Sequence, residues 1–207
     1  MEGANGLDIK RFYKKTNYLS KIYEVDATTK NYIIEISLDK YTDVFNDWDH
    51  ASFKKRDIDP DLVFFLESCS EDIPLKYGID ICFYLPKEIQ DKDRERIIVS
   101  GLKTYYSFYY HTERRTLKES YKKYLGYIIV AFIFLALSYI MANFAKNEIV
   151  YVTLSQGINI GGWVFLWEAI SFVFFKRRKI VYDIKTYERL AGASVYFKYD
   201  NVKRRID

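Results

Sequence analysis

Two long runs of hydrophobic residues stand out in the second half of the chain. The first covers residues 124–145 without a charge, and as a helix it would span about 33 Å, close to the ~30 Å hydrocarbon core of a bilayer. The second covers residues 149–175, and its helix of about 40 Å fits a bilayer only with a tilt or with its first turns at the interface. Because only residues 146–148 connect them, the pattern predicts two transmembrane helices in an antiparallel hairpin.

Basic residues flank both runs at the ends away from the connector. They are Arg114, Arg115, Lys118, Lys122 and Lys123 before the first run, and Lys176, Arg177, Arg178 and Lys179 after the second. The connector offers only Lys146, which Glu148 offsets. Since basic flanks stay inside, we predict a multi-pass protein of the cytoplasmic (inner) membrane with both termini in the cytoplasm. The chain starts without the apolar region of a secretory signal.

Outside these runs, apolar and polar residues alternate as they do in β-strands. The pattern predicts a hairpin with one strand around Ile22, a turn over 26–30 and a second strand over 32–38. Two further strands are predicted over 78–85 and 193–199. The side chains expected on the buried face are Ile34, Ile36, Leu38, Ile79, Ile81, Phe83, Leu85, Val195, Phe197 and Tyr199. Those expected on the opposite face of the third strand are Asp80, Cys82 and Tyr84.

A helical period marks the stretch between the second and third strands. Asp59 suits an N-cap, Pro60 suits the first helical position, and Asp61 suits the positive end of the helix dipole. The apolar stripe of this helix is formed by Leu62, Phe65, Leu66 and Cys69.

Two longer helices are predicted to adjoin the membrane runs. One begins near Asp91 and meets no Pro or Gly between residues 102 and 125, so it is expected to continue into the first span. Its expected buried face consists of Ile97, Ile98, Gly101, Tyr105 and Phe108. The second span is expected to continue outward and to end with a C-cap at Gly192. Its expected apolar seam consists of Ile180, Ile184, Tyr187 and Leu190.

These elements together predict an α+β membrane protein. A small cytoplasmic α/β domain of about four strands and two helices would be built from both chain ends, on a two-helix transmembrane hairpin with a helical stalk. The expected boundaries are 1–116 for the first part of the domain, 117–179 for the hairpin, and 180–207 for the helix and strand that complete the domain.

Composition narrows the range of partners. A net charge of only +4 does not favour nucleic acid as a partner. Two Cys and two His are too few for the usual four-ligand pattern of a structural zinc site, and no cofactor is expected. Cys69 and Cys82 are expected to be core or near-core residues of a protein in a reducing compartment. The basic flanks would attract anionic headgroups, so membrane lipid is an expected partner.

Two stretches of the chain resemble a known family. They are YTDVFNDWDHASFKKRDIDPDLVFFLESCSEDIPLKYGIDICFYLP, which begins at Tyr41, and GINIGGWVFLWEAISFVFF, which begins at Gly157. The chain resembles, over about residues 40–200, an uncharacterised bacterial family of small two-span membrane proteins with a cytoplasmic α/β domain. The resemblance implies the two-span topology and the cytoplasmic domain, and it implies no activity.

The second hydrophobic run is unusual because it contains polar residues and glycines. The polar residues are Gln156, Asn159, Glu168 and Ser171, and the glycines that would allow close helix packing are Gly157, Gly161 and Gly162. Three interpretations of Glu168 remain open. It is protonated and donates a hydrogen bond across a helix interface, or it is ionised and paired with a basic residue, or it lines a water-filled path for protons or cations.

An acidic stretch offers a second candidate site. Asp43, Asp47, Asp49 and Asp57 could supply carboxylate oxygens to Mg²⁺ or Ca²⁺. The spacing of a calcium-binding loop is absent, and neighbouring Lys and Arg residues could pair with these acids instead. The alternatives are therefore a metal site and a charge-paired loop.

No pattern of a common enzyme class is found. His50 and His111 lie far from Cys82 in the sequence, and the phosphate-loop, dinucleotide and nucleophile-elbow motifs are absent, so no catalytic residue is assigned. The basic, aromatic segment KRFYKKTNYLSKIY could lie on a membrane surface or be a solvated tail.

Three functional hypotheses follow. The first is a non-enzymatic homo-oligomer whose cytoplasmic domain binds a protein partner or a small ligand. The second is an oligomeric ion channel or proton-linked subunit with Glu168 and Asn159 along its path. The third is a membrane-tethered, metal-dependent enzyme that uses the acidic stretch.

Overall fold

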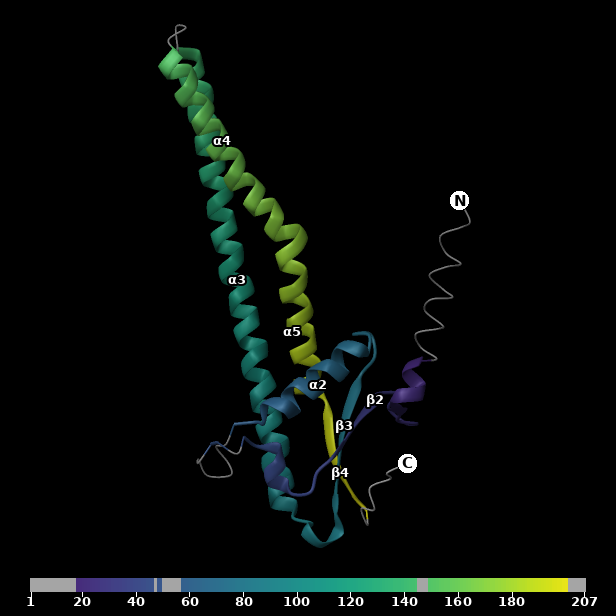
Figure 1. The fold of residues 1–207 in the computed structure, drawn as a ribbon. Helices are drawn as coiled ribbons and strands as arrows, with labels where there is room; N and C mark the ends of the chain where they lie inside the picture. Colours follow the sequence, from purple (N-terminus) through teal and green to yellow (C-terminus); the bar gives the residue numbers. More distant parts are fainter. Residues whose placement is uncertain (1–17, 47, 50–56, 145–148, 201–207) are drawn as a thin grey trace, which may run out of the picture. The chain divides into compact units, whose positions relative to one another are not determined.

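The computed structural model describes residues 18–46, 48, 49, 57–144 and 149–200 (Figure 1). The chain divides into two compact units, of which the first comprises Met1–Tyr109 with Lys185–Asp207 and the second comprises Tyr110–Ile184. The connector over 146–148 and most of the basic N-terminal segment lie outside the described residues. The first unit is therefore discontinuous in sequence, because the second is inserted between its two segments.

A four-stranded sheet forms the centre of the first unit (Figure 1). Its strands lie in the order β1, β2, β3, β4 and cover Glu24–Val25, Tyr32–Ser37, Ile79–Pro86 and Ser194–Asp200. β1 is antiparallel to β2, whereas the β2–β3 and β3–β4 pairs are parallel. The four strands predicted from alternation are thus all present, and they make the fold α+β.

The first strand is shorter than the alternation indicated. Ile22 was predicted as a strand residue, but it lies in a helical segment over 18–22, and β1 has only two residues. The amide of Tyr23 donates to the carbonyl oxygen of Leu19 at 2.8 Å, and both side chains are buried. In a helix, residues four apart lie next to each other on one face, so the helical turn buries Leu19 and Tyr23 together. In an extended strand the same two residues would share a face but lie far apart.

One face of the sheet carries the hydrophobic core of the unit. Parallel pairing sets Ile34 beside Ile81 and Phe83 beside Phe197, whose rings stack with centroids 5.5 Å apart. The helices cover this face with buried residues that include Leu62, Leu66, Cys69, Ile98, Leu102, Tyr106 and Leu190. Two short 3-10 helices, η1 (Tyr41–Val44) and η2 (Lys87–Ile89), lie in the connections.

The opposite face of β3 is also buried at two positions. Asp80 is 2% exposed, and its carboxylate accepts hydrogen bonds from Thr29 Oγ1 and Asn31 Nδ2, both at 3.1 Å. Cys82 is fully buried, and this burial raises the pKa of its thiol. Cys82 is therefore held as a neutral thiol, which is the poorly reactive form.

Helix α2 (Pro60–Asp72) begins as the sequence predicts. The carboxylate of Asp59 accepts from the amides of Asp61 and Leu62 at 2.9 and 3.2 Å, which satisfies two free donors of the first turn. Three of the four predicted stripe residues are buried, but Phe65 is 44% exposed. The buried side of α2 is thus narrower than the predicted stripe.

Helix α3 (Lys92–Phe144) continues without interruption through 53 residues. Asp91 caps it, with Oδ1 accepting from the amides of Asp93 and Arg94. The fully buried residues Ile98, Leu102 and Tyr106 follow each other at intervals of four.

The prediction that Phe108 belongs to the buried face of α3 is wrong, because its side chain is 64% exposed. The stripe of α3 follows i, i+4 and i+8, and two further residues add ~200° of rotation beyond Tyr106. Phe108 therefore points away from the face that α3 turns to the core.

The last helical stretch has three parts. α4 (Ile149–Ser171) is followed by η3 (Phe172–Lys176), which is π-helical, and by α5 (Arg177–Gly192). The predicted seam of α5 ends in the buried Leu190. α5 ends at Gly192, as the sequence predicts, but Gly192 does not have the positive φ that is common at helix ends; the amide of Ala193 bonds the carbonyl oxygen of Leu190.

Arg189 of α5 anchors the end of α2. Its guanidinium donates to the carbonyl oxygens of Ser70, Ile73, Pro74 and Tyr77 and to the Ser70 hydroxyl. The last carbonyl groups of a helix have no partner within the helix and carry partial negative charge. Arg189 supplies both the missing donors and the complementary charge.

Candidate functional site

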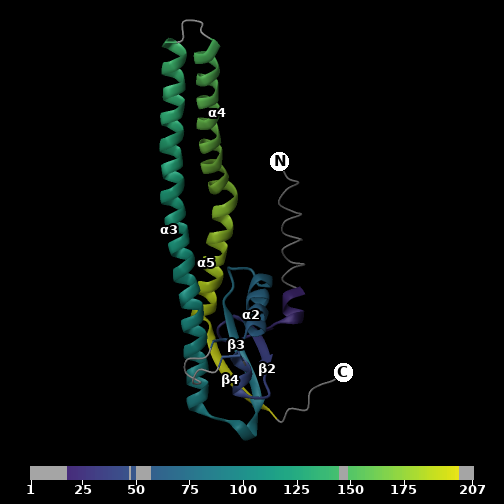
Figure 2. The same cartoon turned by 60° about the vertical axis from the view of Figure 1, so that its left-hand side comes forward.

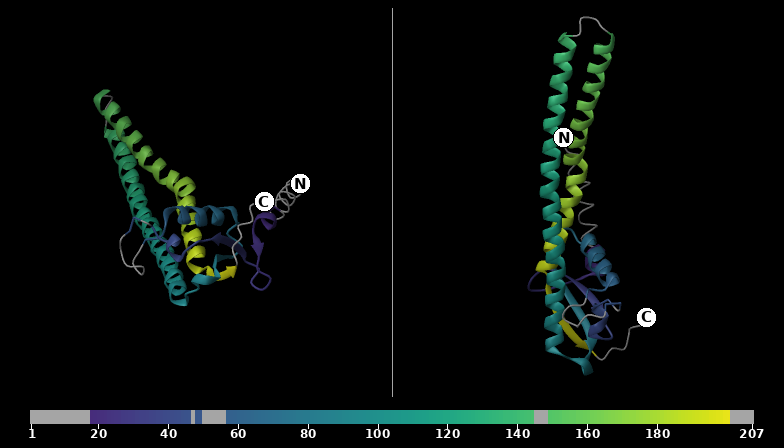
Figure 3. Two further views of the ribbon diagram at one scale, coloured as in Figure 1. Left: turned by 60° about the horizontal axis from the view of Figure 1, so that its bottom comes forward. Right: turned by 90° about the vertical axis from the view of Figure 1, so that its left-hand side faces the viewer.

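The second unit is built on an antiparallel pair of helices, α3 and α4 (Figures 2 and 3). The helical stretches Lys92–Asn143 and Ile149–Gly192 are each long and apolar enough to cross a membrane. Only 11% and 17% of their most apolar segments are buried inside the chain, whereas the core helix of a soluble protein is mostly buried. The hairpin therefore presents a large apolar surface outward.

Residues at intervals of seven, most of them small, hold the two helices together. Ser138 packs at the level of Ser155 and donates from its hydroxyl to the Ser155 carbonyl oxygen at 2.8 Å. One heptad further, Gly162 lies against the backbone of Ala131, and in the next layer Tyr124 and Ala169 are buried in one cluster. A seven-residue repeat keeps one face of a helix toward its partner over several turns. This inward seam consists of Tyr124, Ala131, Ser138, Ser155, Gly162 and Ala169.

The three glycines singled out in the sequence differ in their surroundings. A Cβ at Gly162 would lie 2.9 Å from Leu135 Cγ and 3.2 Å from the backbone oxygen of Ala131. A Cβ at Gly161 would lie 3.1 Å from the ring of Phe134. A Cβ at Gly157 would meet none of the described atoms within 4 Å. Gly162 is thus the glycine whose missing side chain permits the close approach of α3.

Glu168 lies beside the seam and has partners in its own chain. Its Oε1 forms an ion pair with Lys176 Nζ at 2.6 Å, and the hydroxyl of Tyr124 donates to the same oxygen at 3.4 Å. Lys176 Nζ also donates to the Tyr124 hydroxyl at 3.4 Å. This arrangement corresponds to the ion-paired alternative among the three interpretations of Glu168.

The π-helical segment η3 ends at Lys176 and so contains one partner of this ion pair. A π-helix accommodates one extra residue relative to an α-helix, so it changes the phase of everything that follows, and such segments are frequent at functional sites. Phe172, at the start of η3, stacks on the ring of Tyr124 with centroids 4.2 Å apart. Ser171, which was grouped with the polar residues of the run, is half-buried next to it. Nothing in the sequence pattern indicated η3.

Gln156 and Asn159 lie on a different side of α4 from Glu168. Nine residues separate Asn159 from Glu168, and at ~100° per residue they point in opposite directions. Neither amide side chain makes a hydrogen bond to another of the residues that the structure describes, and Gln156 is exposed. The polar residues of this run therefore form two faces.

The two amides belong to a second heptad pattern on α4. It follows intervals of four and three residues through Val152, Gln156, Asn159, Trp163, Leu166 and Ile170, of which Asn159 and Leu166 are half-buried and the other four are exposed. Trp163 is 59% exposed and Ile170 is 39% exposed. We call these six residues the outward stripe. A 3.5-residue repeat is the pattern by which one helix packs along another, and the exposed members of the outward stripe, Val152, Gln156, Trp163 and Ile170, are open to such a partner.

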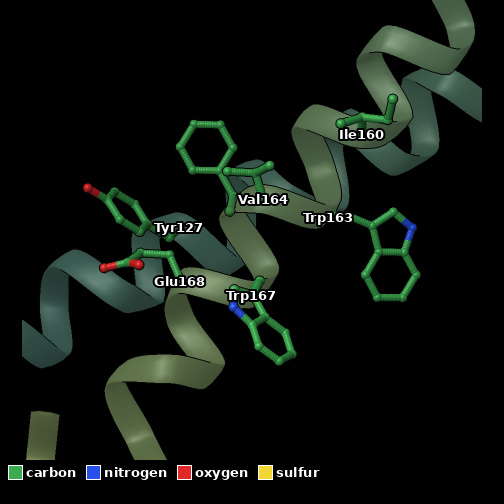
Figure 4. A pocket seen from close by; sticks show the side chains of 7 residues that line it. Tyr127, Ile160, Trp163, Val164, Trp167 and Glu168 are labelled. Carbon is green, nitrogen blue, oxygen red and sulfur yellow. The ribbon is translucent and has the colours of Figure 1, made fainter. Parts of the chain in front are cut away.

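A groove of about 650 Å³ lies on the surface of the hairpin (Figure 4). Tyr127 of α3 and Ile160, Trp163, Val164, Phe165, Trp167 and Glu168 of α4 line it. In Figure 4 the side chains of Tyr127 and Glu168 lie on one side of α4, and those of Trp163 and Trp167 on the other. Its walls are apolar apart from the carboxylate and the Tyr127 hydroxyl. Sequence reasoning missed this groove, because its lining depends on how α3 and α4 pair.

Tyrosines of α3 contact the cations at this end of the hairpin. Arg177 Nε donates to the Tyr121 hydroxyl at 2.5 Å. Lys123 Nζ lies 5.6 Å and 5.5 Å from the ring centroids of Tyr124 and Tyr127, within the range of a cation–π contact. Tyr and basic residues of this kind gather where helices leave the apolar part of a membrane.

The acidic stretch uses its described carboxylates within the chain. Asp43 accepts from the amides of Asp39 and Lys40, and Asp49 accepts from the amide of Asp57 at 2.8 Å. Asp47 and His50 lie outside the described residues. Within the described ranges, no group of three or more His, Cys, Asp or Glu side chains is arranged to hold a metal ion. The carboxylates of Asp43 and Asp49 thus accept hydrogen bonds from backbone amides of the chain itself.

Comparisons with known proteins add no assignment. No protein-family model, no curated protein and no solved structure matches the chain. The resemblance to a family of two-span membrane proteins therefore stays a prediction. The features that bear on function are those of the hairpin.

Proposed function

We propose that the protein is a non-enzymatic, two-span membrane protein that assembles into a homo-oligomer through α4. In this proposal α3 and α4 cross the membrane, both termini are cytoplasmic, and the sheet-containing unit binds a cytoplasmic protein or a small ligand. The apolar outer surface of the hairpin and the basic residues that flank it support this placement.

The observation that carries the proposal is the pair of amides on the outward stripe. Gln156 and Asn159 have no hydrogen-bond partner among the described residues, and their neighbours on the stripe are apolar. An unpaired amide in an apolar medium costs ~1–3 kcal/mol by protein mutational data. A second copy of α4 would supply the missing partners, since amide side chains on membrane helices bond across helix–helix contacts.

Glu168 plays a structural part in this proposal. Its ion pair with Lys176 and its contact with Tyr124 join α4 to α3 and to the last residue of η3. An acid that has its counter-ion in the same chain does not require a conduction path to account for it. The proposal therefore assigns Glu168 to the stability of the hairpin.

The test is the oligomeric state of the full chain in density-matched detergent, measured by sedimentation equilibrium. The double variant Gln156→Leu/Asn159→Leu should weaken assembly by roughly 3- to 30-fold for each hydrogen bond lost, from ~0.6–2 kcal/mol per bond. Thr153→Leu is the matched control, because the Thr153 hydroxyl already bonds the Ile149 carbonyl oxygen.

Two outcomes would contradict the proposal. One is a wild-type chain that stays monomeric at every ratio of protein to detergent. The other is a double variant that assembles as tightly as Thr153→Leu, which would mean that the two amides do not lie in the contact.

A further inference from the structure

The groove on the hairpin opens next to two lysines. Val164, Phe165 and Trp167 give it apolar walls, and Glu168, which also lines it (Figure 4), forms an ion pair with Lys176. Its volume of about 650 Å³ is within the ~300–1,000 Å³ that small-molecule sites occupy. A ligand that fills it must be largely apolar and must tolerate charge at one end.

Two ammonium groups converge on the same aromatic ring at that end. Lys123 Nζ and Lys176 Nζ lie 5.6 Å and 5.8 Å from the centroid of Tyr124. Lys123 also contacts Tyr127, which itself lines the groove. The two lysines come from α3 and η3, so only the paired hairpin brings them together.

Both lysines retain capacity for an anion. An ammonium has three donor hydrogens, and Lys176 directs two of them at Glu168 and Tyr124. Lys123 forms no ion pair with any of the described residues. Two cations therefore face one carboxylate, which leaves a net positive charge beside an apolar groove.

We propose that the groove and the two lysines form a binding site for an anionic phospholipid. The phosphate would lie on Lys123 and Lys176, and one acyl chain would follow the groove along Val164 and Trp167. The inference rests on the proposed insertion of the hairpin into a membrane, but not on its oligomerisation. Charge complementarity selects an anionic headgroup, and the apolar walls select a lipid rather than a soluble phosphate.

The experiment is a lipid titration of the purified full chain in detergent, with bound lipids resolved by native mass spectrometry. The probes are phosphatidylglycerol and phosphatidylcholine with identical acyl chains, and glycerol 3-phosphate as the headgroup without acyl chains. We expect one phosphatidylglycerol to bind per chain at concentrations where phosphatidylcholine does not, and glycerol 3-phosphate not to displace it.

Single variants locate the site. Lys123→Gln should weaken phosphatidylglycerol binding about fivefold, the factor that corresponds to the ~1 kcal/mol contributed by one basic residue near an anionic surface. Lys122→Gln removes the same charge one residue away, on an exposed position, and should change binding less than about twofold. Glu168→Gln should strengthen binding, because it removes the carboxylate that competes for Lys176. Val164→Trp, which fills the groove, should weaken it.

Distinct results would overturn the inference. Equal losses in Lys122→Gln and Lys123→Gln would mean diffuse attraction to the surface. If Val164→Trp abolished assembly but left lipid binding unchanged, the groove would be occupied by a second copy of the chain and not by a lipid. Release of the chain from membranes by alkaline carbonate would contradict membrane insertion itself, and that readout is independent of headgroup preference.

Discussion

At the scale of single residues, polar side chains act where the backbone or an apolar surface leaves a group without a partner. Asp59 supplies acceptors to the first turn of α2, and Arg189 supplies donors to its last turn. The first follows from the local sequence Asp-Pro-Asp, and it was predicted. The second joins residues more than a hundred positions apart, and no local pattern could indicate it.

Arg189→Met should destabilise the first unit by roughly 3 kcal/mol, because several carbonyl groups lose a charged donor at once and hydrogen bonds to charged groups contribute ~1.5–3 kcal/mol each. Arg189→Lys should recover only part of this loss, since an ammonium cannot reproduce the planar fork. Urea unfolding of the full chain in detergent measures the change.

Arg178→Met is the control for that series. Arg178 is exposed, and its substitution removes the same charge as Arg189→Met. A loss of stability in Arg178→Met equal to that in Arg189→Met would show that net charge, and not the anchoring of α2, is responsible.

At the scale of elements, hydrophobic periodicity predicted the positions of the helices and strands well. It predicted less well which of their side chains are buried. Leu62 and Leu66 are buried as the stripe of α2 required, whereas Phe65 and Phe108 are exposed. Periodicity gives the direction of an apolar face, but the width of the contact depends on the partner element. The π-helical η3 was not predicted either, because its one-residue insertion leaves composition and hydrophobicity unchanged.

The sequence likewise did not indicate which glycine of α4 contacts α3. Substitutions at Gly162 and Gly157 test the packing of these two helices. Gly162→Ala should destabilise the hairpin by ~1–3 kcal/mol, because the new methyl group would press on Leu135 and on the backbone of Ala131. Gly157→Ala makes the same change where the described structure has open space, and the higher helix propensity of Ala should leave stability unchanged or slightly raised. Thermal unfolding in detergent, followed by circular dichroism, compares the two.

If Gly157→Ala proved the more damaging of the two substitutions, the inward seam through Gly162 would be wrong. The packing of α3 and α4 would then have to be rotated about the axis of α4, toward the face that carries Gly157.

At the scale of the whole molecule, the chain places its hairpin inside one crossover connection of the sheet. β3 and β4 are parallel neighbours, and parallel neighbours always require a long connection. Here that connection, from Pro86 to Ser194, contains both apolar helices. Both segments of the first unit flank the hairpin in sequence, so a hairpin of two spans would leave them on the same side of a membrane.

The sequence could not indicate which surface of the hairpin meets another copy. Glycines and polar residues occur around most of α4, and their faces separate only when the position of α3 is known. Once Ser155, Gly162 and Ala169 are assigned to the inward seam, Gln156 and Asn159 are left on the outward stripe. The claim that this stripe is the assembly contact is the centre of the account.

Disulfide cross-linking of single-cysteine additions in native membranes tests that claim most directly. The native Cys69 and Cys82 are buried, so they should not interfere. We predict cross-linked dimers for cysteines placed at Val152, Asn159 and Trp163 of the outward stripe, and none for cysteines at Gly157 or Val164. Cross-linking that is equally efficient at both sets of positions, or absent from the stripe, would contradict the account.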